Sequence, residues 1–295
     1  SFSGAGGITG LLAGSSDSTS MVVTLNTGTT GTKTANVQIL LKSNGDAIGN
    51  GLGLTDLGTQ VINLDSVISG TVGNLATAGL SPTTVNFGKF RQGTVTSQTQ
   101  QLTVSNLTTG PGEGLNASFG AASGGASNNG GTITSLATAA SNNTAMSATL
   151  NGLATAGAKS GTQTVNFVSD GSFNGGVTTP LPAQVVNLSA DVYRLAVAGG
   201  TNAVNLAAKR VGDAAATGTL TLANTAAADG FSEGLRGSFG AAPAGFVVSG
   251  PASTALLAAG ASEARTVSLS TATAGNFGGN VDLALVSNGA GTSGF

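Results

Sequence analysis

Three glutamates are the strongest candidates for catalysis in this chain: Glu113, Glu233 and Glu263. A pair of carboxylates is what a glycosidase needs, one as acid and the other as base or nucleophile. However, Glu113 and Glu233 open two nearly identical segments, EGLNASFGAA and EGLRGSFGAA, that lie 120 positions apart (233 − 113). Because a residue at a repeated position is expected to serve the repeated fold, we predict that both are structural and that the chain is not an enzyme.

The amino-acid composition excludes several other kinds of catalytic and metal-binding site. The sequence has no His and no Cys, which excludes Ser-His-Asp and Cys-His catalysis and ordinary zinc sites. Asp46 and Asp170 each adjoin a glycine and could supply oxygen to calcium, but one carboxylate per loop favours a turn instead. The glycine-rich segments 110–114 and 49–53 lack the spacing of phosphate-binding loops and are interpreted as connections between strands. We therefore predict no catalytic, cofactor-binding or metal-binding residue.

Further matched segments show that the repeated unit is a whole domain. Three Ser-(Asn/Asp)-Gly triplets, at 43–45, 169–171 and 287–289, each follow an apolar run that is typical of a strand. Segment 102–106 (LTVSN) matches 220–224 (LTLAN), and segment 60–64 (QVINL) matches 184–188 (QVVNL). Phe2, Phe119 and Phe239 are assigned to one equivalent position. These anchors divide the chain into units at 1–79, 80–198 and 199–295.

The repeated segments favour β-structure. They alternate apolar and polar residues, are rich in β-branched side chains and are punctuated by glycine turns. The alanine-rich stretch 137–148 contains too much Ser, Thr and Asn to favour a helix. The abundance of small residues predicts a core built largely from small side chains. The expected fold class is all-β, as tandem immunoglobulin-like antiparallel β-sandwich domains.

The two outer units look incomplete. On this division the unit at 1–79 lacks the opening strands, and the unit at 199–295 lacks the closing strands. Two interpretations follow: the chain is a piece of a longer array, or a neighbouring copy supplies the missing strands. The apolar terminal residue, Phe295, is expected to be exposed unless something covers it.

One stretch of the second unit resembles a known family. Segment 81–94 (SPTTVNFGKFRQGT), followed by 98–107 (QTQQLTVSNL), resembles the opening of choice-of-anchor D domains, a group similar to the immunoglobulin-like domains named after abnormal spindle and hydin. Segment 224–235 is similar to bacterial members found in tandem on exported proteins. The resemblance implies extracellular display, adhesion or assembly, and it transfers no active-site residue.

Charge and hydropathy indicate which kinds of partner the protein can bind. The net charge is −2, with 10 basic and 12 acidic residues and no basic cluster, which argues against binding to nucleic acid. No apolar run approaches the length of a membrane span. Low surface charge favours self-association or contact with other surface components. The sequence therefore predicts an exported structural or adhesive protein of a bacterial surface, which could form filaments by strand complementation; the alternative is a carbohydrate- or ligand-binding module. No cofactor is expected.

Overall fold

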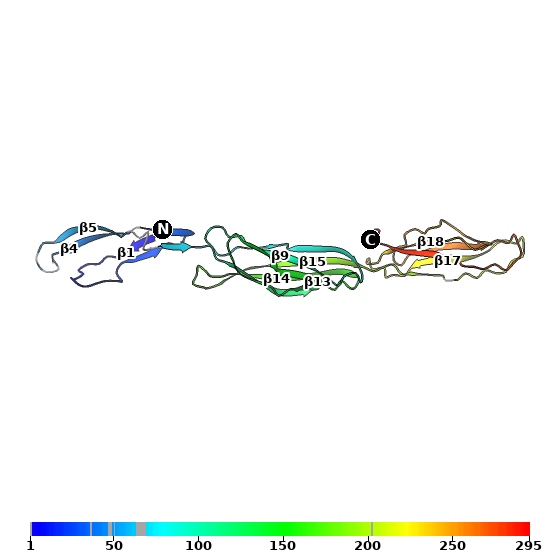
Figure 1. The fold of residues 1–295 in the computed structure, drawn as a ribbon, viewed down its shortest axis with the longest axis horizontal. Helices are drawn as coiled ribbons and strands as arrows, with labels where there is room; N and C mark the ends of the chain where they lie inside the picture. Colours follow the sequence, from blue (N-terminus) through cyan, green and yellow to red (C-terminus); the bar gives the residue numbers. More distant parts are fainter. Residues whose placement is uncertain (1, 36, 47–48, 50, 63–68, 202) are drawn as a thin grey trace.

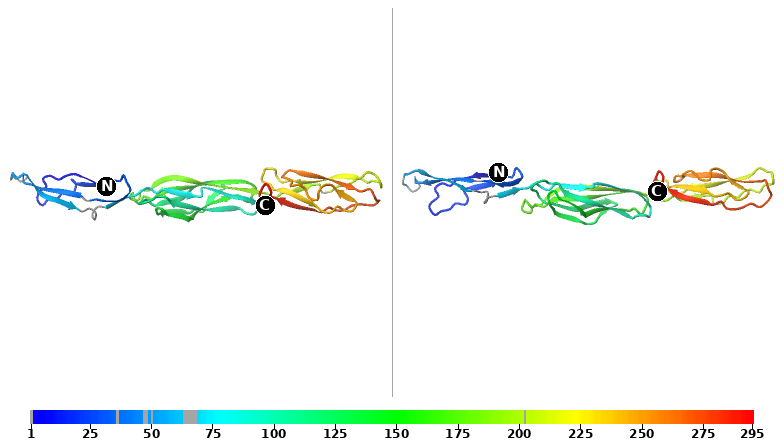
Figure 2. Two further views of the ribbon diagram at one scale, coloured as in Figure 1. Left: turned by 90° about the horizontal axis from the view of Figure 1, so that it is seen from above. Right: turned by 45° about the horizontal axis from the view of Figure 1, so that its top comes forward.

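The chain forms a rod of three β-sheet units arranged end to end (Figures 1 and 2). The structure is a computed structural model that describes all residues except 1, 36, 47–48, 50, 63–68 and 202. The described residues form strands and no helix, which confirms the predicted all-β class. Accordingly, this part of the chain contains no helix with the length and hydropathy to cross a membrane.

The second unit is a two-sheet sandwich. One sheet has the order β12-β10-β14-β15-β8 and the other has the order β11-β13-β9-β7. Their bounds are β7 Ala78–Ser81, β8 Thr84–Arg91, β9 Ser97–Asn106, β10 Leu115–Gly124, β11 Ala126–Asn128, β12 Thr132–Leu136, β13 Ser141–Asn151, β14 Gly157–Ser169 and β15 Thr179–Tyr193. All pairs are antiparallel except that of β15 with β8, which run parallel. Most of the alanine-rich stretch that was not predicted as a helix thus lies in β13 or just before it.

The core of this sandwich is large and contains long side chains. Phe167, Leu102, Leu115, Met146 and Leu150 are at most 1% exposed. Fully burying such a side chain contributes about 1.5–3 kcal/mol to folding. The prediction of a core made largely of small residues is therefore wrong for this unit, because alternate positions along β9, β13 and β14 place their large residues inward. The core also includes Ala76, a few residues before the predicted boundary at 80.

The third unit repeats most of this topology. One sheet has the order β16-β17-β20-β19, which corresponds to β7-β9-β13-β11, and the pair β18-β21 corresponds to β10-β14. Their bounds are β16 Ala198–Gly200, β17 Ala216–Asn224, β18 Gly234–Phe239, β19 Phe246–Val248, β20 Ser262–Leu269 and β21 Leu283–Asn288. In the described residues β21 pairs only with β18, whereas β14 pairs with both β10 and β15. Its buried core is correspondingly small and contains Leu222, Leu235 and Leu257.

The first unit consists of three two-stranded pairs, β1-β2, β3-β6 and β4-β5. Their bounds are β1 Phe2–Ala5, β2 Val22–Leu25, β3 Gly31–Thr34, β4 Val37–Asn44, β5 Leu54–Ile62 and β6 Ser69–Val72. The pairing of Gly31 with Val72 repeats that of Gly157 with Val192, so β3 and β6 correspond to parts of β14 and β15. None of the hydrophobic side chains described before Ala76 is buried, and Leu40 and Leu54 are 60% and 64% exposed.

The aromatic equivalence predicted for the three units holds for only two of them in the strand pairing. Phe119 pairs with Val165 of β14, and Phe239 pairs in the same way with Leu283 of β21. Phe2 instead pairs with Leu25 of β2. Phe2 therefore lies in a different strand arrangement from the other two phenylalanines.

Candidate functional site

The two junctions between units have the same pattern of backbone hydrogen bonds. Asn74 forms an isolated parallel bridge with Gly112 at the first junction, and Arg194 forms one with Ser232 at the second. Glu113 N donates to Asn74 O at 2.9 Å, and Glu233 N donates to Arg194 O at 3.0 Å. The repeated glutamates are thus fixed by the chain segment that enters their own unit from the preceding one.

A buried asparagine supports each junction. Asn106 is 1% exposed, and its Nδ2 donates to Glu113 O and to Leu136 O, both at 3.0 Å. Asn224 is fully buried, and its Nδ2 donates to Glu233 O and to Leu257 O at 3.0 and 3.1 Å. Each Oδ1 accepts two backbone N–H groups, one of them from the incoming segment. Since buried polar groups need partners, these asparagines specify the junction geometry.

The carboxylate of each repeated glutamate also accepts a hydrogen bond from a serine hydroxyl. Ser169 Oγ donates to Glu113 Oε2 at 2.5 Å, and Ser287 Oγ donates to Glu233 Oε2 at 2.7 Å. Both serine hydroxyls accept a backbone N–H of the linker at 2.9 Å, from buried Ala76 in one case and from partly buried Ala196 in the other. The carboxylate, the serine and the linker therefore form one connected network at each junction.

The second junction adds an ion pair between units. Arg91, the last residue of β8, donates from Nε to Glu233 Oε1 at 2.7 Å and from Nη2 to Oε2 at 2.9 Å. The Glu233 side chain is fully buried and the Arg91 side chain is 33% exposed. Ser293 Oγ also donates to Glu233 Oε1. Such a bidentate, charge-assisted contact fixes orientation as well as distance.

The charge state of Glu233 follows from these contacts. Burial acts to raise its pKa, but hydrogen bonds from Arg91, Ser293 and Ser287, together with the positive charge of Arg91, outweigh it. The pKa of Glu233 is therefore lowered from the ordinary 4.5. The hydrogen bonds to Glu233 in turn raise the pKa of Arg91 despite some desolvation. Glu233 is thus held as a carboxylate, which suits a structural anion rather than a general acid.

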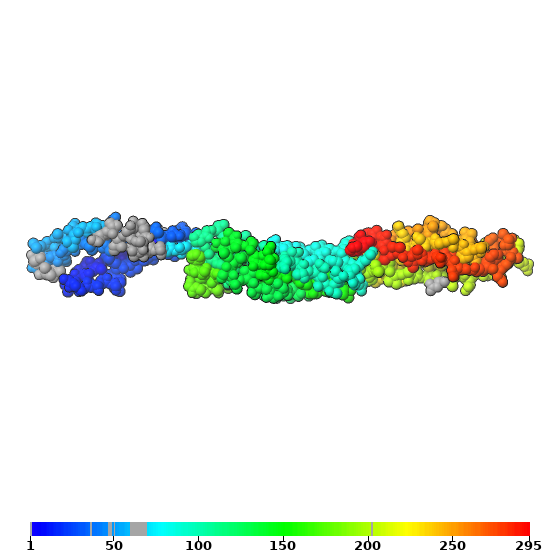
Figure 3. Space-filling view, viewed as in Figure 1, coloured from blue at the N-terminus to red at the C-terminus, as the bar shows by residue number. Residues whose placement is uncertain are grey.

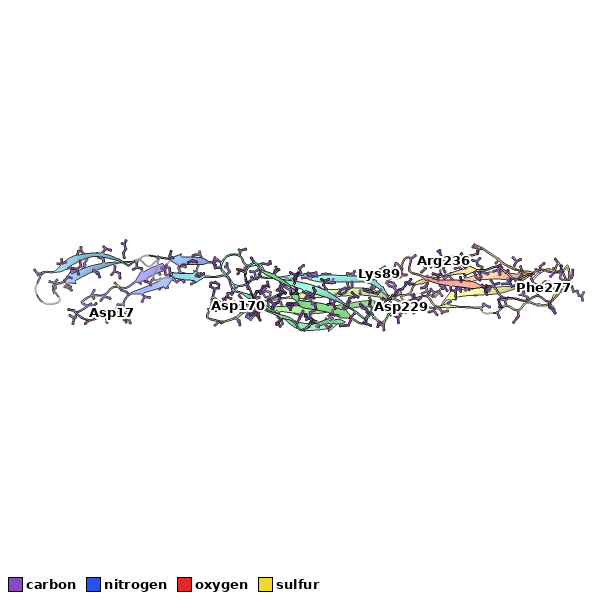
Figure 4. The ribbon with its side chains drawn as sticks, in the orientation of Figure 1. Asp17, Lys89, Asp170, Asp229, Arg236 and Phe277 are labelled. Atoms are coloured by element: carbon purple, nitrogen blue, oxygen red, sulfur yellow. The ribbon has the colours of Figure 1, made fainter. Side chains whose placement is uncertain are left out.

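Further contacts close the second junction. Arg194 Nη1 lies 2.7 Å from both carboxylate oxygens of Asp229, and Tyr193 lies against Phe231 with ring centroids 5.7 Å apart. Figure 4 places Lys89 and Asp229 at this junction, and Figure 3 shows the last residues of the chain lying against it. There the Phe295 ring lies under the Arg91 guanidinium at 5.3 Å, although Phe295 is still 60% exposed.

The repeated glutamates singled out from the sequence lie far apart, and the third glutamate has its own partners. Glu113 and Glu233 lie at opposite ends of the second unit, separated by the length of the 15-residue strand β15, roughly 50 Å at about 3.3 Å per residue. Glu263 lies in the third unit, where Oε2 accepts Ala255 N at 3.1 Å and Oε1 pairs with Arg265. The distance between Glu113 and Glu233 far exceeds the carboxylate spacing that glycosidases use, and Glu263 is engaged by Arg265 and by a backbone amide.

The two aspartates considered for calcium serve turns. Asp170 accepts Gly114 N and Ser172 N, each at 3.0 Å. Burial acts to raise its pKa, but hydrogen bonds from Ser172, Ser135 and Gly114 outweigh this, so the pKa is lowered. Asp46 Oδ1 accepts Gly53 N at 3.1 Å within the loop 49–53, part of which lies outside the described residues. Across the described positions, no group of three or more His, Cys, Asp or Glu side chains could hold a metal ion.

Sequence reasoning missed the partners of the repeated glutamates. Asn106, Asn224, Ser169 and Ser287 all lay inside matched segments, so their recurrence was a usable signal. Arg91 was missed as well, because its contact joins two different units and a repeat within each unit does not show it.

No protein-family profile matches the chain, and no curated protein matches it by sequence. Among solved structures, a protein of unknown function from Porphyromonas gingivalis W83 is 10% identical, covers 65% of this chain and 83% of its own, and has a TM-score of 0.30. The CsuC–CsuE chaperone–tip adhesion subunit complex from Acinetobacter baumannii is 8% identical over 71% of this chain and 99% of its own, with a TM-score of 0.25. The adhesin InvE of Yersinia pseudotuberculosis is 15% identical over 73% and 60%, with a TM-score of 0.19. At these scores the likenesses carry no functional argument.

Proposed function

We propose that this chain is a structural and adhesive repeat protein of a bacterial surface, in which locked β-sandwich units form a stiff extracellular rod. The low charge, the tandem units and the resemblance to choice-of-anchor D domains support export and display. Two of the three candidate carboxylates, Glu113 and Glu233, are bound into the junctions.

The observation that carries this proposal is the network at the second junction. Glu233 of the third unit is bonded by Arg91 of the second unit, while the linker residues Arg194 and Ala196 are bonded into the third unit. A flexible tether would need no such contacts, because linkers normally cross between domains with few bonds. A protein whose units are held in line by hydrogen bonds and an ion pair between them is suited to span a distance.

Two measurements test the proposal. Small-angle scattering of the 295-residue chain should give the maximum dimension of a straight rod, and antibodies against the chain should label intact source cells. A compact or freely bending chain would overturn the rod. Labelling only after cell lysis would overturn surface display.

Within this function, we propose that copies assemble head to tail into filaments by strand complementation. Strand β21 pairs on one edge only among the described residues, and it exposes Leu285 and Val286, 43% and 59% respectively. Unpaired edges with exposed apolar side chains are templates for strand addition.

A second candidate function is a carbohydrate- or ligand-binding module. It is favoured by a cavity of about 290 Å³ in the third unit, lined by residues that include Phe239, Phe246 and Pro251. A glycan-array screen of the wild type tests it, together with the Phe246→Ala variant, which removes an aromatic side chain from the cavity. Glycan binding that this variant abolishes would support the module, and an array without hits would exclude glycans as its ligands.

A further inference from the structure

The first junction has a buried carboxylate without the arginine that its counterpart has. Glu113 is 3% exposed, and in the described residues its side chain accepts only Ser169 Oγ and Gly171 N, both on Oε2. The equivalent Glu233 receives Arg91 on both oxygens. No Arg occurs before position 91 in the sequence. A buried carboxylate without a cation is costly, so this position favours a guanidinium.

There is room at the first junction for such a side chain. A cavity of about 350 Å³ lies between the first and second units, lined by Leu25, Val72, Gly73, Leu75, Glu113, Phe173 and neighbouring residues. The position equivalent to Gly73 is Tyr193, whose ring is buried at the second junction. At the first junction the Phe173 ring lies against Gly73, where the Tyr193 side chain projects in the other copy. The remaining cavity adjoins Glu113, as the Arg91 side chain adjoins Glu233 in the other copy.

The strand beside this cavity has a free edge. In the second unit, the end of β15 pairs with β14 on one side and with β8 on the other, in a parallel register that places Tyr193 opposite Arg91. In the first unit, β6 reproduces the pairing with the β14-like partner, β3. Within the part of the chain that the structure describes, nothing pairs with the other edge of β6. A parallel strand that adds there would deliver its arginine to Glu113.

The chain carries one segment of the required type, at residues 204–211. Its sequence VNLAAKRV resembles VNFGKFRQ at 85–92, and a glycine with positive φ follows each arginine after one residue (Gly93 at 83° and Gly212 at 86°). The turn is also the same: Thr94 N donates to Arg91 O and Asp213 N donates to Arg210 O, both at 3.1 Å. Arg210 is thus the third unit's counterpart of Arg91.

This segment is available for a partner. Residues 203–210 belong to no strand, and Arg210 is exposed, with no partner for its guanidinium among the described residues. Because Arg91 lies at the end of the second unit that faces the third, Arg210 lies at the outer end of the third unit. There, Thr271 Oγ1 donates to Asp213 O, close in sequence to Phe277, which Figure 4 labels at that end of the rod.

We propose that residues 204–211 of a second copy add as a parallel strand to the free edge of β6 and place Arg210 on Glu113. Among the described residues, Glu113 and Arg210 each have no ion-pair partner, and they are the equivalents of the two halves of the Arg91–Glu233 contact, which identifies the partner as another copy. Because donor and acceptor lie on different units, the contact is heterologous and propagates into an open filament. This inference rests on the proposed surface rod and specifies how its copies join.

Sedimentation over a range of concentrations tests the contact by charge. The wild-type chain should associate reversibly, and Arg210→Ala or Glu113→Gln should weaken association at least about tenfold, as expected for loss of one partner of a buried charge pair. Arg236→Ala, which removes another exposed arginine of the third unit, is the matched control and should associate like the wild type. Equal association of Arg210→Ala and Arg236→Ala would overturn the proposal, as would a wild-type chain that stays monomeric throughout.

Cross-linking tests the register without depending on the folding of a Glu113 variant. The native chain has no Cys, so a chain with Thr71→Cys can be mixed with one carrying Ala208→Cys, a pair equivalent to Asp191 and Lys89 in the parallel ladder. Oxidation should give a mixed disulfide dimer. Ala207→Cys should cross-link far less, because adjacent residues of a strand face opposite sides. Equal yields from the two cysteines would overturn the register, while straightness and surface labelling would still test the rod independently.

Discussion

Arg91 at the end of one sandwich and Glu233 at the start of the next share two hydrogen bonds, at 2.7 and 2.9 Å, although they lie 142 residues apart in sequence. Around them, Ser287 Oγ donates to the Glu233 carboxylate and Asn224 Nδ2 donates to Glu233 O, while the linker amide of Ala196 donates to Ser287 Oγ. This contact converts two sandwiches joined by a short linker into one straight body.

Arg91→Ala is expected to loosen the second junction. Glu233 would remain fully buried and hydrogen-bonded to serines but without a cation, which is unfavourable. The third unit should melt several degrees lower in calorimetry, and scattering should show a bent or flexible rod. Gln92→Ala, at the exposed next position, should change neither property. An unchanged rod in the Arg91 variant would contradict a role for this ion pair in stiffness.

Asn224→Ala is expected to destabilise the third unit by more than an ordinary surface change. It removes two donated and two accepted hydrogen bonds at a fully buried position. Leaving buried backbone groups unpaired costs about 1–3 kcal/mol per group. Urea unfolding should show this loss, with exposed Asn205→Ala as the control within about 0.5 kcal/mol of the wild type. A small effect at Asn224 would mean that water replaces the amide.

The stability of the second junction should fall in acid. The pKa of Glu233 is lower in the folded protein than its ordinary 4.5, so its stabilisation is complete above that value and is lost as pH falls through the folded-state pKa. Glu233→Gln lacks this ionisation. The difference in melting temperature between the wild type and Glu233→Gln should therefore be greatest near neutral pH and shrink below pH 4.5. A difference that stays constant down to pH 3 would contradict this assignment.

Phe167→Ala is expected to destabilise the second unit by about 3–5 kcal/mol, since it opens a cavity at a side chain that is 1% exposed. Val185→Ala, on the neighbouring strand but 43% exposed, is the control and should cost far less. Denaturant unfolding followed separately for each unit should localise the effect of the Phe167 change to the second unit. A shift shared by the first unit would show that the units unfold together.

The sequence predicted the strands better than it predicted the contacts between them. The matches LTVSN with LTLAN and Ser-Asp-Gly with Ser-Asn-Gly identified equivalent strand ends, and β9, β17, β14 and β21 lie there. Local alternation suffices for this because it reflects which face of a strand is buried. The structural role predicted for the repeated glutamates agrees with their bonds in the junctions.

The sequence did not predict the strand pairing of Phe2 or the contact of Arg91, because both depend on residues far apart in the chain. Phe2 follows Ser as Phe119 and Phe239 do, yet it pairs with Leu25, because a short motif does not determine which strand lies beside it. Arg91 contacts a glutamate of another unit, and only the straight alignment of the two units brings them together. The similarity of 204–211 to 85–92 becomes informative once the contact of Arg91 is known.

The bridges at the junctions also have a mechanical consequence. Strands run along the rod (Figure 1), so the bonds from Arg194 N to Phe231 O and from Glu233 N to Arg194 O lie across its long axis. A pull on the two ends of the rod therefore loads these bonds in shear, and they must break together rather than one after another. A molecule built in this way resists being stretched at its joints, where tandem domains are usually weakest.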